Sequence, residues 1–289
     1  MFGAVVARAL DTWWEAADRP EPYVVVEAGA GTGALARSVE AAHPACRHAL
    51  QYVLVERSAA LRPAGAYADL PAGPPADVVL ANELLDNLPF LLLERAAGTW
   101  SEVRVASAGG QLVERLVPAA AELAGEAEVL APGAPDGARI PLQRRAAAWL
   151  ADALALAPRG RVVVIDYADT TPSLARRPWP EWLRTYRAHG RGGHPLEQPG
   201  TQDITCDVAV DQLARVRPPS SNRAQADFLA AHGLADLVEA ARAEWHARAH
   251  LGDLDALRAR SRLSEAAALT DPAGLGAFRA LEWHNRRTA

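Results

Sequence analysis

Val24-Val25-Val26-Glu27-Ala28-Gly29-Ala30-Gly31-Thr32-Gly33 is the stretch that decides the fold of this chain. Its valines predict a buried strand, and the glycine-rich turn that follows opens a helix expected from Thr32 to about Ala42. A second apolar strand, Gln51 to Val55, also ends in a carboxylate, Glu56. This order of strand, turn, helix and strand builds a mononucleotide pocket at the carboxyl edge of a parallel sheet.

The glycine turn fits two cofactors, and the carboxylate before it helps to separate them. Backbone without Cβ lets a ligand approach closely, and a helix N-terminus favours an anionic group by ~0.3–1 kcal/mol. Glu27 sits poorly beside the pyrophosphate of a nicotinamide dinucleotide, but well beside the ammonium or sulfonium of S-adenosylmethionine (SAM). Glu56 can accept the ribose hydroxyls of either cofactor. The expected cofactor-binding residues are Glu27, Gly29, Gly31, Gly33 and Glu56.

Two alternatives stay open at this point. The glycine turn could be only a tight strand-to-helix connection, since the fingerprint taken alone is weak. A nicotinamide-dependent oxidoreductase would use the same glycines and Glu56 equally well.

An acidic turn follows the next predicted strand. Asp77 to Ala81 is a short apolar run, typical of a strand buried on both faces, and Asn82-Glu83-Leu84-Leu85-Asp86 comes after it. If a helical turn starts at Asn82, Glu83 and Asp86 lie three residues apart on one face. Two carboxylates there could hold a cationic nucleophile, and arginine suits this because its guanidinium stays protonated and matches carboxylates. Asn82, Glu83 and Asp86 are therefore candidate catalytic residues; alternatively, Asn82 only caps a helix whose first turn favours acids.

Composition excludes several classes of partner. The 289 residues carry a net charge of -5, which argues against nonspecific binding to nucleic acid. The two cysteines, Cys46 and Cys206, form no CxxC pair, and His246 and His250 lack an evident third ligand, so no metal site is expected. No secretory signal and no apolar run of the ~18 residues that span a bilayer is found. We expect a cytoplasmic protein without membrane insertion.

Strands that alternate with helices along the chain predict an α/β fold with a mainly parallel sheet. The third strand is difficult to place in a segment rich in Pro, Gly and Ala, where residues 66–70 are its candidate. A β-hairpin is expected around Gly109-Gly110, followed by a surface loop over 118–138. The remaining predicted elements are helices at 5–17, 142–156, 223–232 and 234–266, a strand at 162–167, and a segment of poor periodicity at 172–221.

Together these motifs resemble the MidA-type SAM-dependent methyltransferases, the family that includes the mitochondrial complex I assembly-factor arginine methyltransferase. The likeness runs from Phe2-Gly3 to near Leu281, and its most specific parts are the Asn-Glu-Leu-Leu-Asp and Gln-Asp-Ile-Thr segments. The segments that carry it are, in chain order, Glu27 to Gly33, Val55-Glu56-Arg57-Ser58, Ala81 to Asp86, Ile165-Asp166-Tyr167, His189, Pro199 to Thr205, and Gln225 to Leu229.

The resemblance implies a Rossmann-like class I methyltransferase fold, with a mainly parallel seven-strand sheet and helices on both faces. It implies a single methyltransferase domain over 1–289, with a hairpin and loop insertion at about 97–140 and an irregular substrate-side segment at about 172–221. SAM is then the cofactor, and the acceptor is an arginine of a partner protein or, alternatively, a small molecule. Asn82, Glu83 and Asp86 would face the methyl group, and the implied acceptor-side residues are Asp166, Tyr167, His189 and Asp203.

Three features depart from the family pattern. Family members usually carry a further segment before the Phe-Gly pair; Arg139-Ile140-Pro141 stands where many relatives have an acidic stretch; and Ala168 replaces the glycine that commonly follows Asp-Tyr. These departures keep a second hypothesis open, a non-catalytic assembly or binding module on the same fold. The sequence identifies neither the acceptor nor the oligomeric state.

Overall fold

The computed structural model of the chain describes residues 1–187 and 190–284. The chain forms two compact units, each built from separate stretches of sequence. Unit 1 comprises Met1–Asn82, Ala153–Ile165 and Pro219–Ala289, and unit 2 comprises Glu83–Asp152 and Asp166–Pro218.

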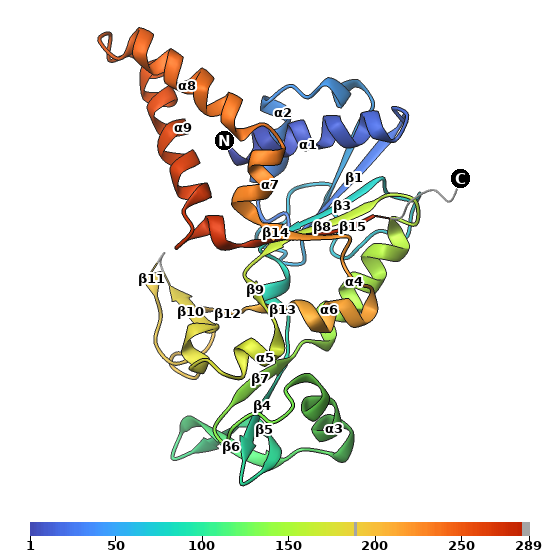
Figure 1. The fold of residues 1–289 in the computed structure, drawn as a ribbon, viewed down its shortest axis with the longest axis vertical. Coiled ribbons are helices and arrows are strands. Elements are labelled where there is room, and N and C mark those ends of the chain that lie inside the picture. Colours follow the sequence, from blue (N-terminus) through green and yellow to red (C-terminus); the bar gives the residue numbers. More distant parts are fainter. Residues whose placement is uncertain (188–189, 285–289) are drawn as a thin grey trace. The chain divides into compact units, whose positions relative to one another are not determined.

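A six-stranded sheet forms the centre of unit 1, in the order β14-β15-β8-β3-β1-β2 (Figure 1). The strands β2, β1, β3 and β8 run parallel, and β14 pairs with β15 in the antiparallel sense. All six residues of β1 are buried, as expected for a strand covered on both faces. The strands are β1 (Tyr23–Ala28), β2 (Leu50–Val55), β3 (Val78–Asn82), β8 (Arg161–Asp166), β14 (Ser221–Ala224) and β15 (Arg279–His284).

The expected seventh strand is absent from this sheet among the described residues. Beyond β2 there is only an isolated parallel bridge between Val55 and Tyr67, so the prediction of a strand at 66–70 was wrong. Four prolines and two glycines lie between residues 61 and 75. Proline donates no ladder hydrogen bond and glycine weakens a strand, so this segment cannot sustain regular pairing.

Among the residues that the structure describes, five helices lie wholly within unit 1, and the helix predicted after the glycine turn is confirmed as α2. The first helix buries one apolar face that includes Val5, Leu10 and Trp13. Figure 1 shows α8 and α9 as two long helices side by side, and Asp253 caps α9 by accepting from the backbone N–H of Ala256 at 2.9 Å. The bounds are α1 (Phe2–Ala16), α2 (Ala34–Ala41), α7 (Gln225–Ala231), α8 (Leu234–Arg248) and α9 (Leu254–Thr270).

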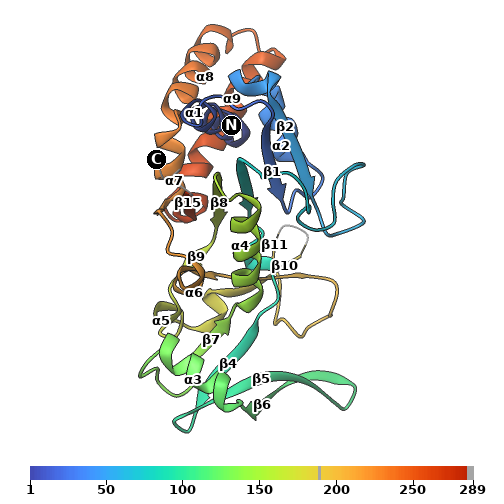
Figure 2. The same ribbon diagram turned by 90° about the vertical axis from the view of Figure 1, so that its right-hand side faces the viewer.

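Unit 2 is built on small antiparallel sheets and short helices. Its four-stranded sheet has the order β6-β5-β4-β7, and Figure 2 shows β5 and β6 as a long hairpin. The strands are β4 (Leu91–Ala96), β5 (Thr99–Ala108), β6 (Gln111–Pro118), β7 (Arg139–Leu142), β9 (Ala168–Asp169), β10 (Leu183–Arg187), β11 (Gly190–Arg191), β12 (Asp203–Cys206) and β13 (Val208–Ala209). The helices are α3 (Ala121–Leu130), α5 (Thr171–Leu174) and α6 (Val210–Val216), and α4 (Arg144–Leu156) begins here and continues into unit 1.

The hairpin around Gly109-Gly110 is confirmed, but two other expectations for this part of the chain were wrong. The supposed loop at 118–138 contains α3, whose Ala127 and Leu130 are buried with Trp100. The supposed irregular segment at 172–221 contains several short strands and two helices. In both places burial against distant residues stabilises structure that local periodicity does not reveal.

Four short 3₁₀ turns complete the secondary structure of the described residues. They are η1 (Ala45–His48), η2 (Leu85–Asn87), η3 (Trp179–Glu181) and η4 (Leu275–Ala277). Within the described ranges, no helix combines the length and the apolar character that crossing a bilayer requires.

Candidate functional site

The glycine turn of unit 1 takes a backbone conformation that side chains disfavour. Gly29, Gly31 and Gly33 have φ values of +73°, +52° and +77°. Glycine adopts this left-handed region without steric cost, and Gly33 then serves as the N-cap of α2. The alternating glycines predicted from the sequence therefore have a conformational reason.

A hollow of about 320 Å³ lies next to this turn, within unit 1. Three predicted site residues contribute to its wall: Glu27 and Gly29 from the end of β1, and Asn82 from the end of β3. The structure thus groups Asn82 with the predicted cofactor residues. The complete lining is Met1, Phe2, Gly3, Glu27, Gly29, Ala30, Ala34, Leu35, Ser38, Asn82 and Glu265.

The most unusual group in this wall is the carboxylate of Glu27. The residue is only 4% exposed, and its Oε2 atom has no hydrogen-bond partner among the residues that the structure describes. Burial raises the pKa of Glu27 to about 7, although the nearby Tyr52 hydroxyl acts in the opposite direction. The backbone amide of Ala36 also lowers that pKa, but a buried carboxylate with one unpartnered oxygen is still costly to the fold, and a cationic ligand would offset that cost.

Glu56, at the end of the second strand, organises the turn itself. Its Oε2 accepts a hydrogen bond from the Gly31 amide at 2.8 Å, and its Oε1 accepts one from the Ser58 amide at 2.7 Å. Each carboxylate oxygen can still accept a further bond, so ribose hydroxyls remain acceptable partners. Gly31, Gly33 and Glu56 therefore shape the turn without lining the hollow.

The second group of predicted residues forms an acidic cluster in unit 2. Asp166 is fully buried, and its Oδ2 accepts from the backbone amides of Leu85 and Asp86 at 2.9 and 3.3 Å. Its Oδ1 accepts from the Tyr167 amide at 2.9 Å. Asp166 thus fixes η2, the turn that carries Asp86, so its contacts are those of a positioning residue.

The carboxyl groups of this cluster are held close together. Burial, followed by the charge of Glu83, raises the pKa of Asp86 to about 7, while Asn87 and Arg184 partly oppose that rise. Burial and the charge of Asp86 raise the pKa of Asp166 well above its usual range. Titratable groups with such environments are typical of functional sites. Glu83 itself is exposed and has a φ of +50°, a conformation that is rare for a residue with a Cβ.

A guanidinium group lies beside these acids. The Arg184 guanidinium stacks over the ring of Tyr167, 4.3 Å from its centroid, and donates to the Asp207 carboxylate. It is also close enough to Asp86 to lower the pKa of that residue. This unit can therefore hold a guanidinium between an aromatic face and carboxylates.

The two remaining predicted acceptor-side residues are His189 and Asp203. His189 lies outside the described residues, and Asp203 is an exposed residue at the start of β12, paired with Tyr186. Arg139, which stands where relatives carry an acidic stretch, forms ion pairs with Glu94 and Glu114. The arginine is thus neutralised within its own sheet.

Comparison with known proteins identifies the family. The family described as "Putative S-adenosyl-L-methionine-dependent methyltransferase" matches residues 5–226. The chain belongs to this methyltransferase family. No match is found among curated proteins.

Two solved structures support the assignment. A COG1565 superfamily protein from Burkholderia thailandensis is 25% identical with a TM-score of 0.80, over 98% of this chain and 78% of that one. A COG1565 superfamily member from the same organism, bound to S-adenosyl-homocysteine, is 26% identical with a TM-score of 0.79, over 97% of this chain and 75% of that one. The protein is a SAM-dependent methyltransferase of MidA type with a class I methyltransferase-like α/β fold, and its cofactor is SAM rather than a nicotinamide dinucleotide.

The hollow of unit 1 fits the charge of that cofactor. SAM carries an ammonium and a sulfonium, and Glu27 contributes a largely buried carboxylate to the wall of the hollow. Glu265 of α9 brings a second carboxylate to the same wall, where it accepts from the Met1 amino group and the Phe2 amide. The carboxylates of Glu27 and Glu265 therefore make the wall of this hollow suitable for a cationic ligand.

Sequence reasoning missed three residues of these sites: Tyr52, Glu265 and Arg184. Tyr52 could be associated with Glu27 only once the register was known, because Glu27 pairs with Leu54 and Tyr52 lies two residues earlier on the same face of the sheet. Glu265 lies beyond the stretch that the family match covers, and Arg184 is one of many arginines. Neither carries a local pattern that would distinguish it.

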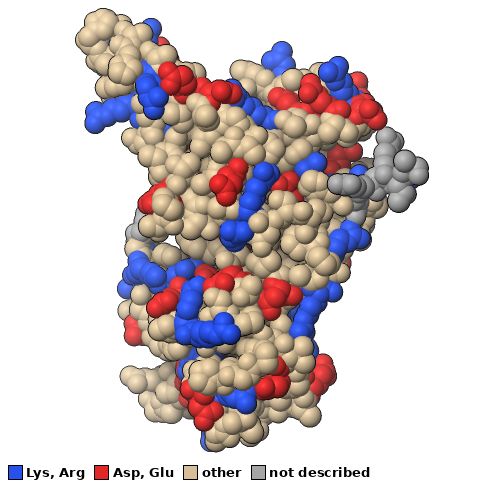
Figure 3. Space-filling model, viewed as in Figure 1, with Lys and Arg blue, Asp and Glu red and all other residues tan. Residues whose placement is uncertain are grey.

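The surface of the methyltransferase shows charges of both signs. On the face in Figure 3, arginines and acidic residues are interspersed over the described parts of the chain.

No group of three or more histidine, cysteine or acidic side chains suited to a metal ion occurs in residues 1–187 and 190–284.

The raised pKa of Asp86 predicts a pH-dependent stability. Between pH ~4, where an unfolded aspartate ionises, and pH ~7, the native carboxyl keeps a proton that the unfolded chain has lost. Stability therefore falls as pH rises through this window, and Asp86→Asn removes that loss. About three pKa units correspond to ~4 kcal/mol, so we expect the free energy of unfolding of the variant, measured by urea titration, to exceed that of the wild type by up to ~4 kcal/mol at pH 8 and to match it near pH 4. The exposed Asp152→Asn is the control, and an equal effect at both pH values would contradict the prediction.

Proposed function

We propose that the methyltransferase transfers a methyl group to an arginine side chain of a partner protein. The observation that carries this proposal is the guanidinium of Arg184, which lies over Tyr167 and close enough to Asp86 to lower its pKa. A site that accommodates one guanidinium between an aromatic ring and carboxylates has the chemistry to accommodate another.

The proposed roles divide between two groups of residues. Glu27, Gly29 and Asn82 bind the cofactor, with Gly31, Gly33 and Glu56 holding the turn in shape. Glu83 and Asp86 orient the acceptor, Asp166 positions η2, and Tyr167 offers an aromatic face. His189 and Asp203 remain proposed acceptor-side residues on the family resemblance alone.

When bound, SAM supplies an electrophilic methyl group. The chain's own contribution is to orient the acceptor nitrogen and to receive the proton that it loses when a new N–C bond forms. Carboxylates at Glu83 and Asp86 draw positive charge toward the two nitrogens that they bind, which leaves the third more nucleophilic. Such orientation can be worth ~7–11 kcal/mol of the barrier.

Calorimetric titration tests the cofactor half of the proposal. SAM should bind while NAD does not, and Glu56→Ala should weaken SAM binding ~10–100-fold, because the Gly31 amide loses its acceptor and the ribose loses a partner. Glu40→Ala, an exposed residue of α2, is the matched control and should bind as the wild type does. Unchanged affinity in Glu56→Ala would remove Glu56 from the site.

The acceptor half is tested with SAM labelled in the methyl group. Arginine-containing peptides should gain label and the mass of a methyl group, whereas peptides with lysine in place of arginine should not. Label found instead only on small amines would overturn the arginine proposal while leaving the cofactor site intact.

A further inference from the structure

Two buried oxygen atoms on neighbouring strands of unit 1 lack hydrogen-bond partners among the described residues. They are Oε2 of Glu27 on β1 and the hydroxyl of Tyr52 on β2. Val25 pairs with Tyr52 and Glu27 with Leu54, so both side chains point to the same face of the sheet. A hydrogen bond from the Tyr52 hydroxyl to the Glu27 carboxylate would satisfy both oxygen atoms.

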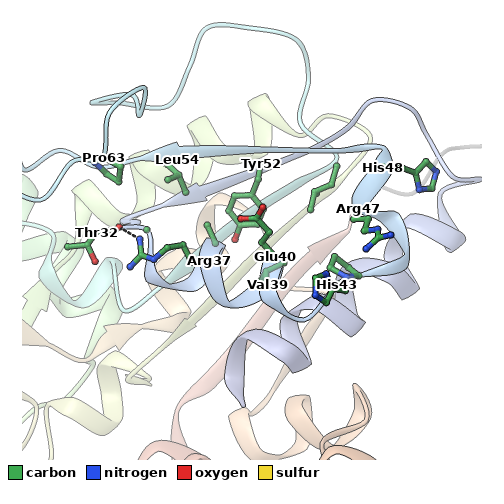
Figure 4. A pocket seen from close by; sticks show the side chains of 14 residues that line it. Thr32, Arg37, Val39, Glu40, His43, Arg47, His48, Tyr52, Leu54 and Pro63 are labelled. Atoms are coloured by element: carbon green, nitrogen blue, oxygen red, sulfur yellow. Dashed lines mark hydrogen bonds between the residues drawn. The ribbon is translucent and has the colours of Figure 1, made fainter. Parts of the chain in front are cut away.

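Tyr52 and Glu27 line different spaces of unit 1. Figure 4 shows the side chain of Tyr52 projecting from β2 toward α2, where it lines a groove of about 770 Å³. Glu27 lines the cofactor hollow. The Tyr52 hydroxyl also acts on Glu27 directly, because it opposes the effect of burial on the pKa of that carboxyl.

Few other charged groups face Glu27. The Met1 amino group at the start of α1 and Glu265 on α9 belong to the same hollow and pair with one another. The contributions of α2 and β3 to the hollow, Ser38 and Asn82 among them, carry no charge. The donors that lower the pKa of Glu27 are the Tyr52 hydroxyl on β2 and the backbone amide of Ala36 on α2, and of the two only Tyr52 can be removed by a side-chain substitution.

We propose that Tyr52 is a positioning residue for cofactor binding, whose hydroxyl donates to Glu27 and holds it as the carboxylate that the cationic cofactor requires. This inference rests on the proposed cofactor site. In the free protein part of the population carries a proton on Glu27; when SAM binds, the O–H bond breaks, the electron pair stays on the carboxylate, and the proton passes to solvent.

The proposal gives cofactor binding a definite pH profile. Below pH ~7 SAM affinity should fall up to tenfold per pH unit, because the proton must leave Glu27 first. Tyr52→Phe removes the donor, which raises the pKa of Glu27. SAM affinity therefore begins to fall at a higher pH in this variant. The affinity of the variant should be ~10-fold weaker than wild type at pH 6.5 and equal to it at pH 9.

Calorimetry with SAM at pH 6 to 9, in buffers of different protonation enthalpy, measures both affinity and the number of protons released. Wild type should release close to one proton at pH 6, where the ammonium of SAM is fully protonated, and Glu27→Gln should release none at that pH. Tyr67→Phe, which removes an exposed phenol from the same unit, is the control and should follow the wild type.

Two outcomes would overturn the inference. If Tyr52→Phe weakens binding equally at every pH, Tyr52 has only a structural role; if it changes nothing, it has no role. Failure of the wild type to bind SAM at any pH overturns the proposed cofactor site itself, a result distinct from the other two.

Discussion

Glu83→Ala is expected to lower methyl transfer about 10²–10⁴-fold while SAM binding stays unchanged. Glu83 lies in the acidic cluster of unit 2, at an exposed position next to Asp86, whose pKa its charge helps to raise. The loss of one carboxylate removes an orienting contact and a proton acceptor. Initial rates with an arginine peptide, together with calorimetry for SAM, separate the two effects.

The backbone of Glu83 provides a further discriminating variant. Its φ of +50° costs a side-chain-bearing residue about 1 kcal/mol, a cost that glycine avoids. Glu83→Gly should therefore be at least as stable as the wild type and still lack activity. Glu122→Ala, an exposed glutamate of α3, is the matched control with full activity. Active Glu83→Gly would show that the strained residue is not retained for catalysis.

Glu27→Gln is expected to weaken SAM binding about 100-fold at pH 8, because the amide cannot pair with a cation. The same change should raise the free energy of unfolding by about 1–3 kcal/mol, since a buried carboxylate with an unpartnered oxygen is replaced by a neutral group of the same shape. A gain in stability together with a loss of affinity is the signature of a residue kept for binding.

Urea denaturation and SAM calorimetry on the same preparation check both halves of this prediction. Glu40→Gln, which makes the same chemical change at an exposed position of α2, should alter neither quantity. A Glu27→Gln protein that binds SAM normally would place the cofactor's cationic groups elsewhere. A loss of stability would instead mean that the hydrogen bonds accepted by the carboxylate outweigh the cost of burying its charge.

Much of unit 1 could be predicted because its signals are local. A run of valines, a carboxylate and alternating glycines occupy consecutive positions, and sterics favour glycine where φ is positive, as it is at Gly29, Gly31 and Gly33. The helix α2 and the strands β1, β2, β3 and β8 lie close to their expected positions. The seventh strand was expected from the family resemblance, and the prolines of residues 61–75 prevented it.

Unit 2 was harder to predict because long-range burial decides its elements. Alanine-rich α3 looked like a loop until its contact with Trp100 was known. The short strands of 172–221 are likewise too brief to show periodicity. Chain segments of this kind are specified by what they pack against rather than by their own pattern.

The sequence by itself determined the family, the cofactor class and the two carboxylates at the strand ends, because these depend on residue types at fixed spacing. Only the tertiary structure decided how those groups are partnered. The carboxylate of Asp166 accepts a hydrogen bond from the amide of Leu85, 81 residues earlier in the chain. The Tyr52 hydroxyl of β2 lies close enough to Glu27 of β1 to lower the pKa of that residue. Hydrogen bonds and burial join positions that are remote in sequence, and no local pattern records which polar atom is left without a partner.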